Sequence, residues 1–310
     1  MSQAIEEQAL QAARARQQAW ATSRRRRARL LDRGSRALTF VVVSLFALLF
    51  VFPIYWMVIT ALKTAPEVFA IPPVWWSANP QWHNLWDVLN PASPNYSNFA
   101  FWSYAWHTAQ ITVPATLGTT ISSSLVAYGF SRLRWKGRDV VFYLVLATLM
   151  IPNWVTLVPL YILFNKIGWV NTYQPLVVPS FFGDAFSIFL LRQFFLRQPQ
   201  ELVEAARVDG ASHLRVYLQI ILPLARPALA VVALFAFINS WTDFFNPLIY
   251  LSNQDKYTLQ LGLYNFFGQH MVDWPNFMAA SLWVLAPVAI LFFFTQKTFI
   301  EGITFTGLKG

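Results

Sequence analysis

Long stretches without a charged residue divide this chain. No Asp, Glu, Lys or Arg occurs within residues 37–62, 140–165 or 274–296. Each stretch is longer than the ~20 apolar residues that a helix needs to cross the hydrocarbon core of a bilayer. Three such stretches are too many for the buried helices of a soluble protein, so the pattern predicts an all-α integral membrane protein.

Shorter apolar stretches between these three complete the predicted membrane domain. We expect six spans, at about residues 37–62, 107–130, 140–164, 174–196, 227–250 and 277–299. The first segment is longer than the hydrophobic region of a signal peptide, and no small-residue cleavage site follows it. We therefore expect this segment to remain as a membrane anchor.

Lysine and arginine are distributed unevenly between the predicted loops. Twenty of the 23 lie in residues 1–36, 131–139 and 192–226 or in the C-terminal tail. The other three lie in the alternate loops: Lys63, Lys166 and Lys256. Because loops rich in these residues stay on the cytoplasmic side, the count predicts six spans with both termini in the cytoplasm.

Composition agrees with a membrane protein, since only 12% of the residues are charged against about 25% in soluble domains. The net charge of +9 raises the alternative of a nucleic-acid partner. Much of the excess, however, lies in "RRRRARLLDRGSR", which immediately precedes the first span. Such a cluster is typical of a topology signal that binds anionic lipid. We therefore expect residues 1–36 to form a basic cytoplasmic region before a membrane domain at 37–310, with no nucleic-acid partner.

The longest loop on the predicted outer side, residues 63–106, is rich in tryptophan. Six tryptophans lie in it: Trp75, Trp76, Trp82, Trp86, Trp102 and Trp106. Three interpretations stay open. The aromatic rings can form an interfacial belt, a docking surface for an extracytoplasmic partner, or platforms for a sugar.

Several kinds of chemistry have no motif in this chain. There is no GxxxxGK[ST] phosphate loop, no HExxH or GxSxG motif, and no cysteine. The histidines are far apart and lack the spacing of metal ligands: His83, His107, His213 and His270. We expect no metal or cofactor in this chain. A membrane enzyme, the alternative from another functional class, would need a catalytic constellation that the sequence does not offer.

Few polar groups lie inside the predicted spans. Asp184 and Asp243 are the only carboxylates well inside them. Because a buried ionised group is costly in hydrocarbon, such residues usually face protein or water. Asn239, Asp243 and Asn246 are spaced to share one helix face, which can line a polar path or form a hydrogen-bonded cluster that joins two spans. Gly183 before Asp184 suits a bent helix that opens on a cavity.

A polar module at residues 199–223 separates the fourth and fifth spans on the predicted cytoplasmic side. A first helix would begin near Pro199, with an apolar stripe of Leu202, Ala205 and Ala206. Asp209 and Gly210 would stop it, and Ser212 would cap a second helix. The apolar stripe of that helix would contain Leu214, Tyr217, Leu218 and Ile221, and Pro223 would end it. The pattern predicts two short amphipathic helices at an angle.

The module also carries a known signature. Glu204-Ala205-Ala206, three residues, Gly210, nine residues, Ile220, one residue and Leu222-Pro223 match the "EAA" signature of permease subunits in bacterial binding-protein-dependent ABC importers. "FLLRQFF", "NSWTDFFNPLIYL" and "GITFTGLKG" also resemble the carbohydrate-uptake group of that family. Over residues 37–310, the chain most resembles the smaller permease subunit of maltose-type importers.

The resemblance implies a type I ABC importer permease fold in the bacterial inner membrane, without enzymatic activity of its own. A second permease subunit, a dimer of ATPase subunits that uses ATP and Mg²⁺, and an extracytoplasmic solute-binding protein would be its partners. Glu204 would contact the ATPase, Ala205 and Ala206 would permit close approach, and Gly210 would supply the bend. Other residues of the module would complete the contact with the ATPase: Arg207, Asp209, Ile220, Leu222 and Pro223. The tail Gly307–Gly310 would lie near the ATPase dimer.

The cargo implied by the resemblance is a sugar, and an oligosaccharide is expected. Asn239, Asp243, Asn246 and Asp184 are the candidate residues of the translocation path. A glycerol-phosphate importer of the same group is the closest alternative. An anionic substrate would favour basic groups along the path, and the spans contain none, which favours a neutral saccharide.

Overall fold

A computed structural model describes residues 36, 38–90, 99–264, 266–267 and 272–304, and from residue 297 onward it describes the backbone alone. The chain divides into two units, residues 1–59 and 60–310, which are treated separately. Most of the basic N-terminal region, His270 and the tail Gly307–Gly310 lie outside the described residues.

The first unit contains most of a single long helix, Leu38–Ala61. This helix is long and apolar enough to cross a membrane. From Leu38 to Phe52 its large apolar side chains are exposed on all sides, as Phe40 and Phe50 illustrate with exposed fractions of 73% and 74%. A helix that is apolar all round is typical of a membrane span. The helix bounds agree with the predicted first span to within one residue at each end.

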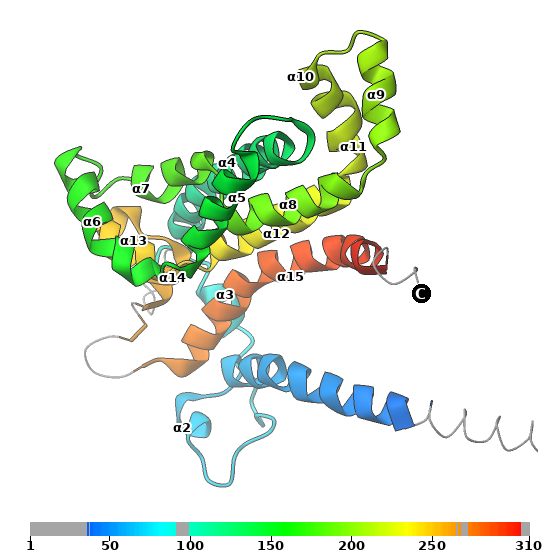
Figure 1. The fold of residues 1–310 in the computed structure, drawn as a ribbon. Helices are drawn as coiled ribbons and strands as arrows, with labels where there is room; N and C mark the ends of the chain where they lie inside the picture. The colour runs from blue at the N-terminus through cyan, green and yellow to red at the C-terminus, as the bar shows by residue number, and fades with distance from the viewer. Residues whose placement is uncertain (1–35, 37, 91–98, 265, 268–271, 305–310) are drawn as a thin grey trace, which may run out of the picture. The chain divides into compact units, whose positions relative to one another are not determined.

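The second unit is helical, and no strand occurs in its described part. In chain order its elements (Figure 1) are α2 (Ala65–Val68), α3 (Asn84–Asp87), α4 (Phe101–Arg132), α5 (Arg138–Ala147), η1 (Thr148–Met150), α6 (Asn153–Lys166), α7 (Gln174–Val177), η2 (Val178–Phe182), α8 (Ala185–Arg197), α9 (Gln200–Val208), α10 (His213–Val216), η3 (Tyr217–Ile221), α11 (Leu222–Leu224), α12 (Arg226–Trp241), α13 (Phe245–Tyr250), η4 (Gln254–Lys256), α14 (Leu259–Tyr264) and α15 (Trp274–Thr304).

The central helix of this unit is α4, which packs against α8 and α12. Beside large apolar side chains it buries small polar ones, including Thr108, Thr112, Ser123 and Ser124. The Thr108 hydroxyl donates to the Tyr104 carbonyl at 2.8 Å and accepts from the Leu259 amide at 2.9 Å. Small side chains with internally satisfied hydroxyls let helices approach closely inside a membrane bundle, which explains why a polar helix can occupy the centre.

The helices that could cross a membrane are fewer, by length and composition, than the six predicted spans. Among the described residues, three qualify as single segments: Leu38–Ala61, Gln174–Arg197 and Trp274–Gln296. Two bent pairs raise the number to five if each pair is one span. At 32 residues, α4 has about 48 Å of length, but its serines and threonines keep it less apolar than the others.

Three of the predicted spans are interrupted, each for a local reason, and the interruption at Gly183 agrees with the bent helix expected there. The predicted third span is two segments, Arg138–Met150 and Asn153–Lys166, which meet at a bend of 97°. Pro152 lies at that bend, and the residue before a proline avoids the helical conformation. The predicted fifth span stops at Trp241 and resumes at Phe245. The predicted fourth span is interrupted at Gly183, whose φ of 88° is accessible mainly to glycine.

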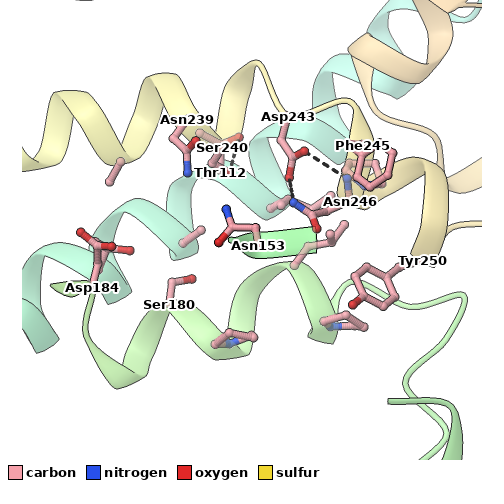
Figure 2. A pocket seen from close by; sticks show the side chains of 18 of the residues that line it. Thr112, Asn153, Ser180, Asp184, Asn239, Ser240, Asp243, Phe245, Asn246 and Tyr250 are labelled. Atoms are coloured by element: carbon pink, nitrogen blue, oxygen red, sulfur yellow. Dashed lines mark hydrogen bonds between the residues drawn. The ribbon is translucent and has the colours of Figure 1, made fainter. Parts of the chain in front are cut away.

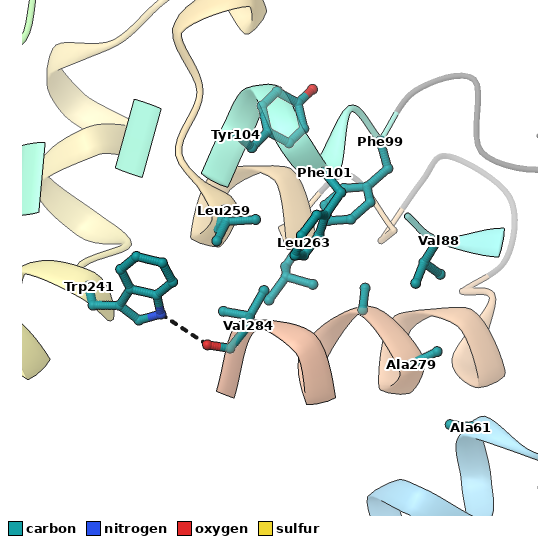
Figure 3. Packing of buried hydrophobic residues seen from close by; sticks show 11 residues of the cluster. Ala61, Val88, Phe99, Phe101, Tyr104, Trp241, Leu259, Leu263, Ala279 and Val284 are labelled. Atoms are coloured by element: carbon teal, nitrogen blue, oxygen red, sulfur yellow. Dashed lines mark hydrogen bonds between the residues drawn. The ribbon is translucent and has the colours of Figure 1, made fainter. Parts of the chain in front are cut away.

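Two large clusters of buried apolar side chains, and a smaller one around Phe142, hold the second unit together. The first cluster joins α4, α12, α14 and α15, and its buried members shown in Figure 3 include Phe101, Leu259 and Trp241. The Trp241 indole donates to the Val284 carbonyl at 2.9 Å, which joins α12 to α15 (Figure 3). The second cluster, called here the module cluster, lies at the other end of α4 and contains Tyr128, Phe195 and Val216.

Replacing Gly262 with alanine should destabilise the first cluster. A Cβ at this position would lie 2.7 Å from Cε2 of Tyr104 and 3.0 Å from Cε2 of Phe99, and both rings are buried. Overpacking of this kind costs about 1–3 kcal/mol. We expect thermal unfolding of the purified protein to shift down by several degrees. The matched variant Gly129→Ala, which meets nothing within 4 Å, should unfold at the original temperature or slightly above it. Equal melting temperatures for the two variants would contradict this packing.

Candidate functional site

A cavity of about 700 Å³ lies between α4, α6, the η2–α8 segment, α12 and α13. Its lining includes all four residues that the sequence suggested for a path through the membrane: Asp184, Asn239, Asp243 and Asn246. Figure 2 shows these side chains around one space, with Thr112, Asn153 and Ser180. The cavity therefore brings together residues that are up to 134 positions apart in the chain.

Three helix interruptions reach this cavity. Asn153 begins α6 directly after Pro152, Asp184 caps α8 directly after Gly183, and Asp243 lies between α12 and α13. In a membrane protein, non-helical backbone is tolerated only where it is buried in protein or lines a water-filled cavity. Interrupted membrane helices are also the usual element of transporter binding sites. The convergence of three interruptions marks this cavity as the candidate functional site.

The two carboxylates of the cavity are held by short local hydrogen bonds. Asp243 accepts from the backbone amide of Asn246 at 3.1 Å and from its side-chain amide at 2.9 Å (Figure 2). Asp184 accepts from the Ser187 amide at 2.8 Å and thereby caps α8. Both carboxylates accordingly fix the backbone where a helix restarts, and neither uses these bonds to hold a second helix.

The predicted single helix face of Asn239, Asp243 and Asn246 was wrong, because α12 ends at Trp241. The three side chains still line the same cavity, since the chain restarts at α13 beside it. The hydrogen bond that does join two helices here runs from Ser240 on α12 to Thr112 on α4, at 3.2 Å.

The sequence interpretation missed several residues of the lining. Asn153 was overlooked although "IPN" in the middle of a charge-free stretch signals an interruption. Trp154 and Phe245 were also missed, and their rings meet edge to face with centroids 4.5 Å apart. No sequence signal could pair these two aromatic residues, because they come from helices 91 positions apart.

A second site is the polar module, where the predicted turn is confirmed. The first helix, α9, ends at Val208, and Gly210 adopts a left-handed φ of 79°. The Ser212 hydroxyl then accepts from the Arg215 amide at 3.3 Å and caps the second helical segment. The second segment, His213–Leu224, meets α12 at a bend of 81°.

The predicted apolar faces of the module helices were partly wrong. In α9, Leu202 and Ala205 are exposed, and the side chain that packs inward is Val203, supported by Ala206. In the second segment, Leu214 and Leu218 are exposed, whereas Val216, Tyr217 and Ile221 are buried. The segment Tyr217–Ile221 is a π-helix, whose wider turn changes which residues share a face.

Pro223 does not end the second segment, which continues to Leu224. In a regular α-helix the Pro223 ring would clash with the carbonyl of residue 219. A π turn directly before a proline relieves such a clash by widening the backbone. The proline therefore accounts for the π turn and with it for the shift of the buried face.

The module is tied firmly to α4. Ser124 and Tyr217 share a buried hydrogen bond of 2.6 Å, and the Tyr128 hydroxyl donates to the His213 carbonyl at 3.1 Å. At the end of α4, the Arg132 guanidinium donates to the carbonyls of Phe195 and Gln198 and to the side chain of Gln200. Arg132 thus joins the end of α4, the end of α8 and the start of α9.

The residues expected at the ATPase contact divide between two faces of the module. Glu204, Ala205, Arg207, Asp209, Gly210 and Pro223 are exposed. Ala206, Ile220 and Leu222 are half-buried and pack against the module cluster. Among the described residues, Glu204 makes no hydrogen bond or ion pair, so its conformation does not depend on a contact within this unit.

Residues 118–303 match the family described as binding-protein-dependent transport system inner membrane component. The chain belongs to this family. The sequence-based assignment to the permease subunits of ABC importers is thereby confirmed. The matched region contains the module and the three helix interruptions that reach the cavity.

Named relatives of this permease cover most of its length. It is 33% identical to the arabinooligosaccharides transport system permease protein AraQ of Halalkalibacterium halodurans, over 72% of this chain and 82% of that protein. It is 32% identical to the trehalose/maltose transport system permease protein MalG of Thermococcus litoralis, over 89% of this chain and 97% of that protein.

The fold of the permease is also that of a solved transporter. A chain from the crystal structure of a bacterial ABC transporter involved in the import of the acidic polysaccharide alginate superimposes with a TM-score of 0.74. The alignment covers 86% of this permease and 96% of that chain at 23% sequence identity. The all-helical ABC importer permease fold is therefore established, although the identity is too low to carry over a substrate.

The long loop of the permease after the first helix is held by one carboxylate. Glu67 accepts hydrogen bonds from the Thr64 amide at 2.9 Å and from the Ser77 hydroxyl at 2.8 Å. These bonds favour the ionised form and hold the pKa of Glu67 below its usual range.

The tryptophans of this loop lie mostly at its surface. Trp75 and Trp76 are more than half exposed, and the centroid of the Trp86 ring lies 5.5 Å from the centroid of the Trp283 ring. All six tryptophans of the loop are thus more than half exposed, Trp86 included, and the three interpretations of them stay open.

Proposed function

We propose that this permease forms half of the translocation path of an ATP-driven importer that takes up a saccharide, with an oligosaccharide as the expected cargo. The observation that carries the proposal is the polar cavity where three helix interruptions meet, in a chain of this family. The relatives support a saccharide cargo, since they are named as permeases for arabinooligosaccharides and for trehalose and maltose.

The proposed membrane arrangement has six spans in the bacterial inner membrane, with both termini in the cytoplasm. The spans would be Leu38–Ala61, α4, the α5–α6 pair, the α7–α8 run, the α12–α13 pair and α15. The uneven distribution of lysine and arginine supports this orientation. The membrane domain would comprise residues 37–310 and the basic cytoplasmic region residues 1–36.

The lining of the cavity favours a neutral cargo over a phosphate ester. Among the described residues, the lining contains hydroxyls, side-chain amides and the carboxylates of Asp184 and Asp243, but no lysine, arginine or histidine. Desolvating an anion beside two carboxylates would be unfavourable, because like charges repel strongly in a medium of low dielectric. Hydroxyls of a neutral saccharide can instead donate to both carboxylates. This argument favours a neutral saccharide over the glycerol-phosphate alternative.

The exposed part of the module would receive the ATPase. Glu204, Ala205, Arg207 and Gly210 lie on its exposed surface, and ATP and Mg²⁺ would bind in the ATPase subunits rather than in this chain. A second permease subunit would complete the path, and an extracytoplasmic solute-binding protein would deliver the cargo. The tail Gly307–Gly310 would lie near the ATPase dimer.

Uptake by proteoliposomes that contain the complete transporter tests this function. We expect uptake of a neutral oligosaccharide that requires ATP inside, the solute-binding protein outside and this permease in the complex. A panel of neutral saccharides and glycerol phosphate would be offered in parallel. Transport of glycerol phosphate alone would overturn the neutral-cargo assignment, and uptake that persists without this permease would overturn the proposed function.

Replacing Asp243 with alanine should slow uptake. The change removes a carboxylate from the cavity and the cap that holds the start of α13, and the loss of such a cap costs about 1 kcal/mol. We expect the rate of saccharide uptake to fall about fivefold, the factor that corresponds to about 1 kcal/mol. Asp243→Asn removes the charge but keeps an acceptor oxygen for the Asn246 amide. This variant therefore separates the effect of the lost charge from the effect of the lost cap. The control Asp255→Ala lies on η4 outside the cavity. Undiminished uptake by Asp243→Ala would exclude a role for this carboxylate in the path.

A further inference from the structure

The loop between α4 and α5 borders a second cavity, of about 470 Å³, that the proposed path does not use. Its lining is compact and mostly polar: Arg134, Trp135, Gly137, Arg138, Asp139 and Val140. The Trp135 indole donates to the Gly129 carbonyl at 3.3 Å, which fixes the ring at the end of α4. The loop therefore presents an ordered surface rather than a set of independent side chains.

Positive charge exceeds negative charge around this cavity. Asp139, the carboxylate of the lining, is shared by Arg138 at 3.1 Å and Arg192 at 3.6 Å. Arg192 is further held over the Phe142 ring, 4.0 Å from its centroid. Arg134 is exposed and has no acidic partner within the described part of the chain. Asp139 thus pairs with two guanidinium groups, and Arg134 adds a third positive charge to the lining, so the surplus is complementary to an anion.

An apolar face leads away from the cavity along α5. Val140, Tyr143 and Leu144 follow one another at helical spacing, and their exposed fractions are 64%, 68% and 63%. The ten residues of α5 rise by about 15 Å, which is about half of the ~30 Å hydrocarbon core of a bilayer. The whole helix therefore has about the length of the acyl chains in one leaflet, and the charged cavity lies at its first turn.

We propose that this site binds an anionic phospholipid. The phosphodiester headgroup lies between Arg134 and Arg138, Trp135 lies at the level of the headgroups, and the acyl chains lie along Val140, Tyr143 and Leu144. Guanidinium groups suit this role because their planar fork matches phosphate oxygens. The proposed orientation places the site in the cytoplasmic leaflet, where anionic lipid attracts basic segments. The lipid site itself requires neither a saccharide cargo nor a particular ATPase contact.

Native mass spectrometry of the intact transporter in detergent tests the site. Phosphatidylglycerol and phosphatidylcholine would be titrated separately, and their masses distinguish the bound species. We expect wild type to retain phosphatidylglycerol in preference to phosphatidylcholine. Arg134→Gln should weaken phosphatidylglycerol binding about fivefold, the effect of one basic residue near a membrane surface. Because Arg134 has no acidic partner among the described residues, this variant should fold normally.

Two further variants make the test specific. Lys136→Gln removes the same charge from the same loop but from a residue outside the cavity lining, so it should bind phosphatidylglycerol like wild type. Arg134→Lys keeps the charge and should lose less binding than Arg134→Gln. Equal binding of the two lipids, or equal losses in Arg134→Gln and Lys136→Gln, would overturn the site. Displacement of the lipid by inorganic phosphate at millimolar concentration would overturn the assignment to a lipid, and loss of the ATPase from the Arg134→Gln complex would indicate a protein partner instead.

Discussion

Reversing the charge of Glu204 to lysine is expected to abolish saccharide uptake while leaving the permease folded. Glu204 is exposed on α9 and makes no hydrogen bond or ion pair among the described residues, so the substitution removes no such contact within the chain. In the proposed complex the carboxylate is buried against the ATPase. Breaking a buried charged contact between proteins costs about 2–5 kcal/mol. We therefore expect uptake, and ATP hydrolysis stimulated by the loaded binding protein, to fall by at least about 30-fold.

The control for this prediction is Glu201→Lys, which makes the same charge reversal one turn earlier on the same helix. Glu201 is exposed and lies outside the signature. We expect this variant to keep most of its uptake and to melt at the same temperature as Glu204→Lys. Normal stimulated ATP hydrolysis in assembled Glu204→Lys transporter would sink the proposed role of the module.

Replacing Arg132 with alanine should weaken the mechanical connection between the module and the membrane helices, so that movement of the module no longer moves the helices efficiently. Its guanidinium donates to two carbonyls at the end of α8 and to Gln200 at the start of α9. Truncation to alanine leaves these carbonyls without their charged donor, and hydrogen bonds to charged groups contribute about 1.5–3 kcal/mol each. We expect Arg132→Ala to lower the melting temperature and to reduce the amount of saccharide transported per ATP hydrolysed.

Uptake and ATP hydrolysis measured on the same proteoliposomes check this prediction. Lys136→Ala, an exposed basic residue four positions further along, is the matched control and should keep the ratio of wild type. Arg132→Lys should fall between the two, because one ammonium cannot reproduce the fork of three contacts. An unchanged ratio in a fully stable Arg132→Ala transporter would show that the link between α4 and the module has no part in coupling.

The sequence alone predicted the helical class and the position of the module, because both depend on local signals. Charge-free stretches locate the helices, and Gly210 and Ser212 act through backbone conformation and capping within a few residues. The register of the module was not predictable in the same way. The π turn at Tyr217–Ile221 changes the face that is buried, and helical-wheel spacing assumes that no such turn exists.

The cavity shows a second limit of prediction from the sequence alone. An average of hydropathy over a window cannot detect that the backbone stops being helical at Ile151–Pro152 or after Trp241. The polar residues near these interruptions were visible in the sequence, and Asp184 and Asp243, the candidates for a translocation path, line the cavity. Their meeting with Asn153 and Trp154 depends on how distant helices pack around α4, and one sequence carries no direct record of those contacts.

Cross-linking from Glu204 tests the central claim, that the module receives an ATPase in the cytoplasm, most directly. The natural chain has no cysteine, so Glu204→Cys can be labelled alone with a photoactivated cross-linker in the assembled transporter. Gln254→Cys on η4, in a predicted outer loop, is the control for sidedness. We predict that the label at residue 204 attaches to the ATPase, and that a membrane-impermeant thiol reagent outside the cell blocks residue 254 but not residue 204. Attachment to no ATPase subunit, or blocking of residue 204 from outside, would contradict the account.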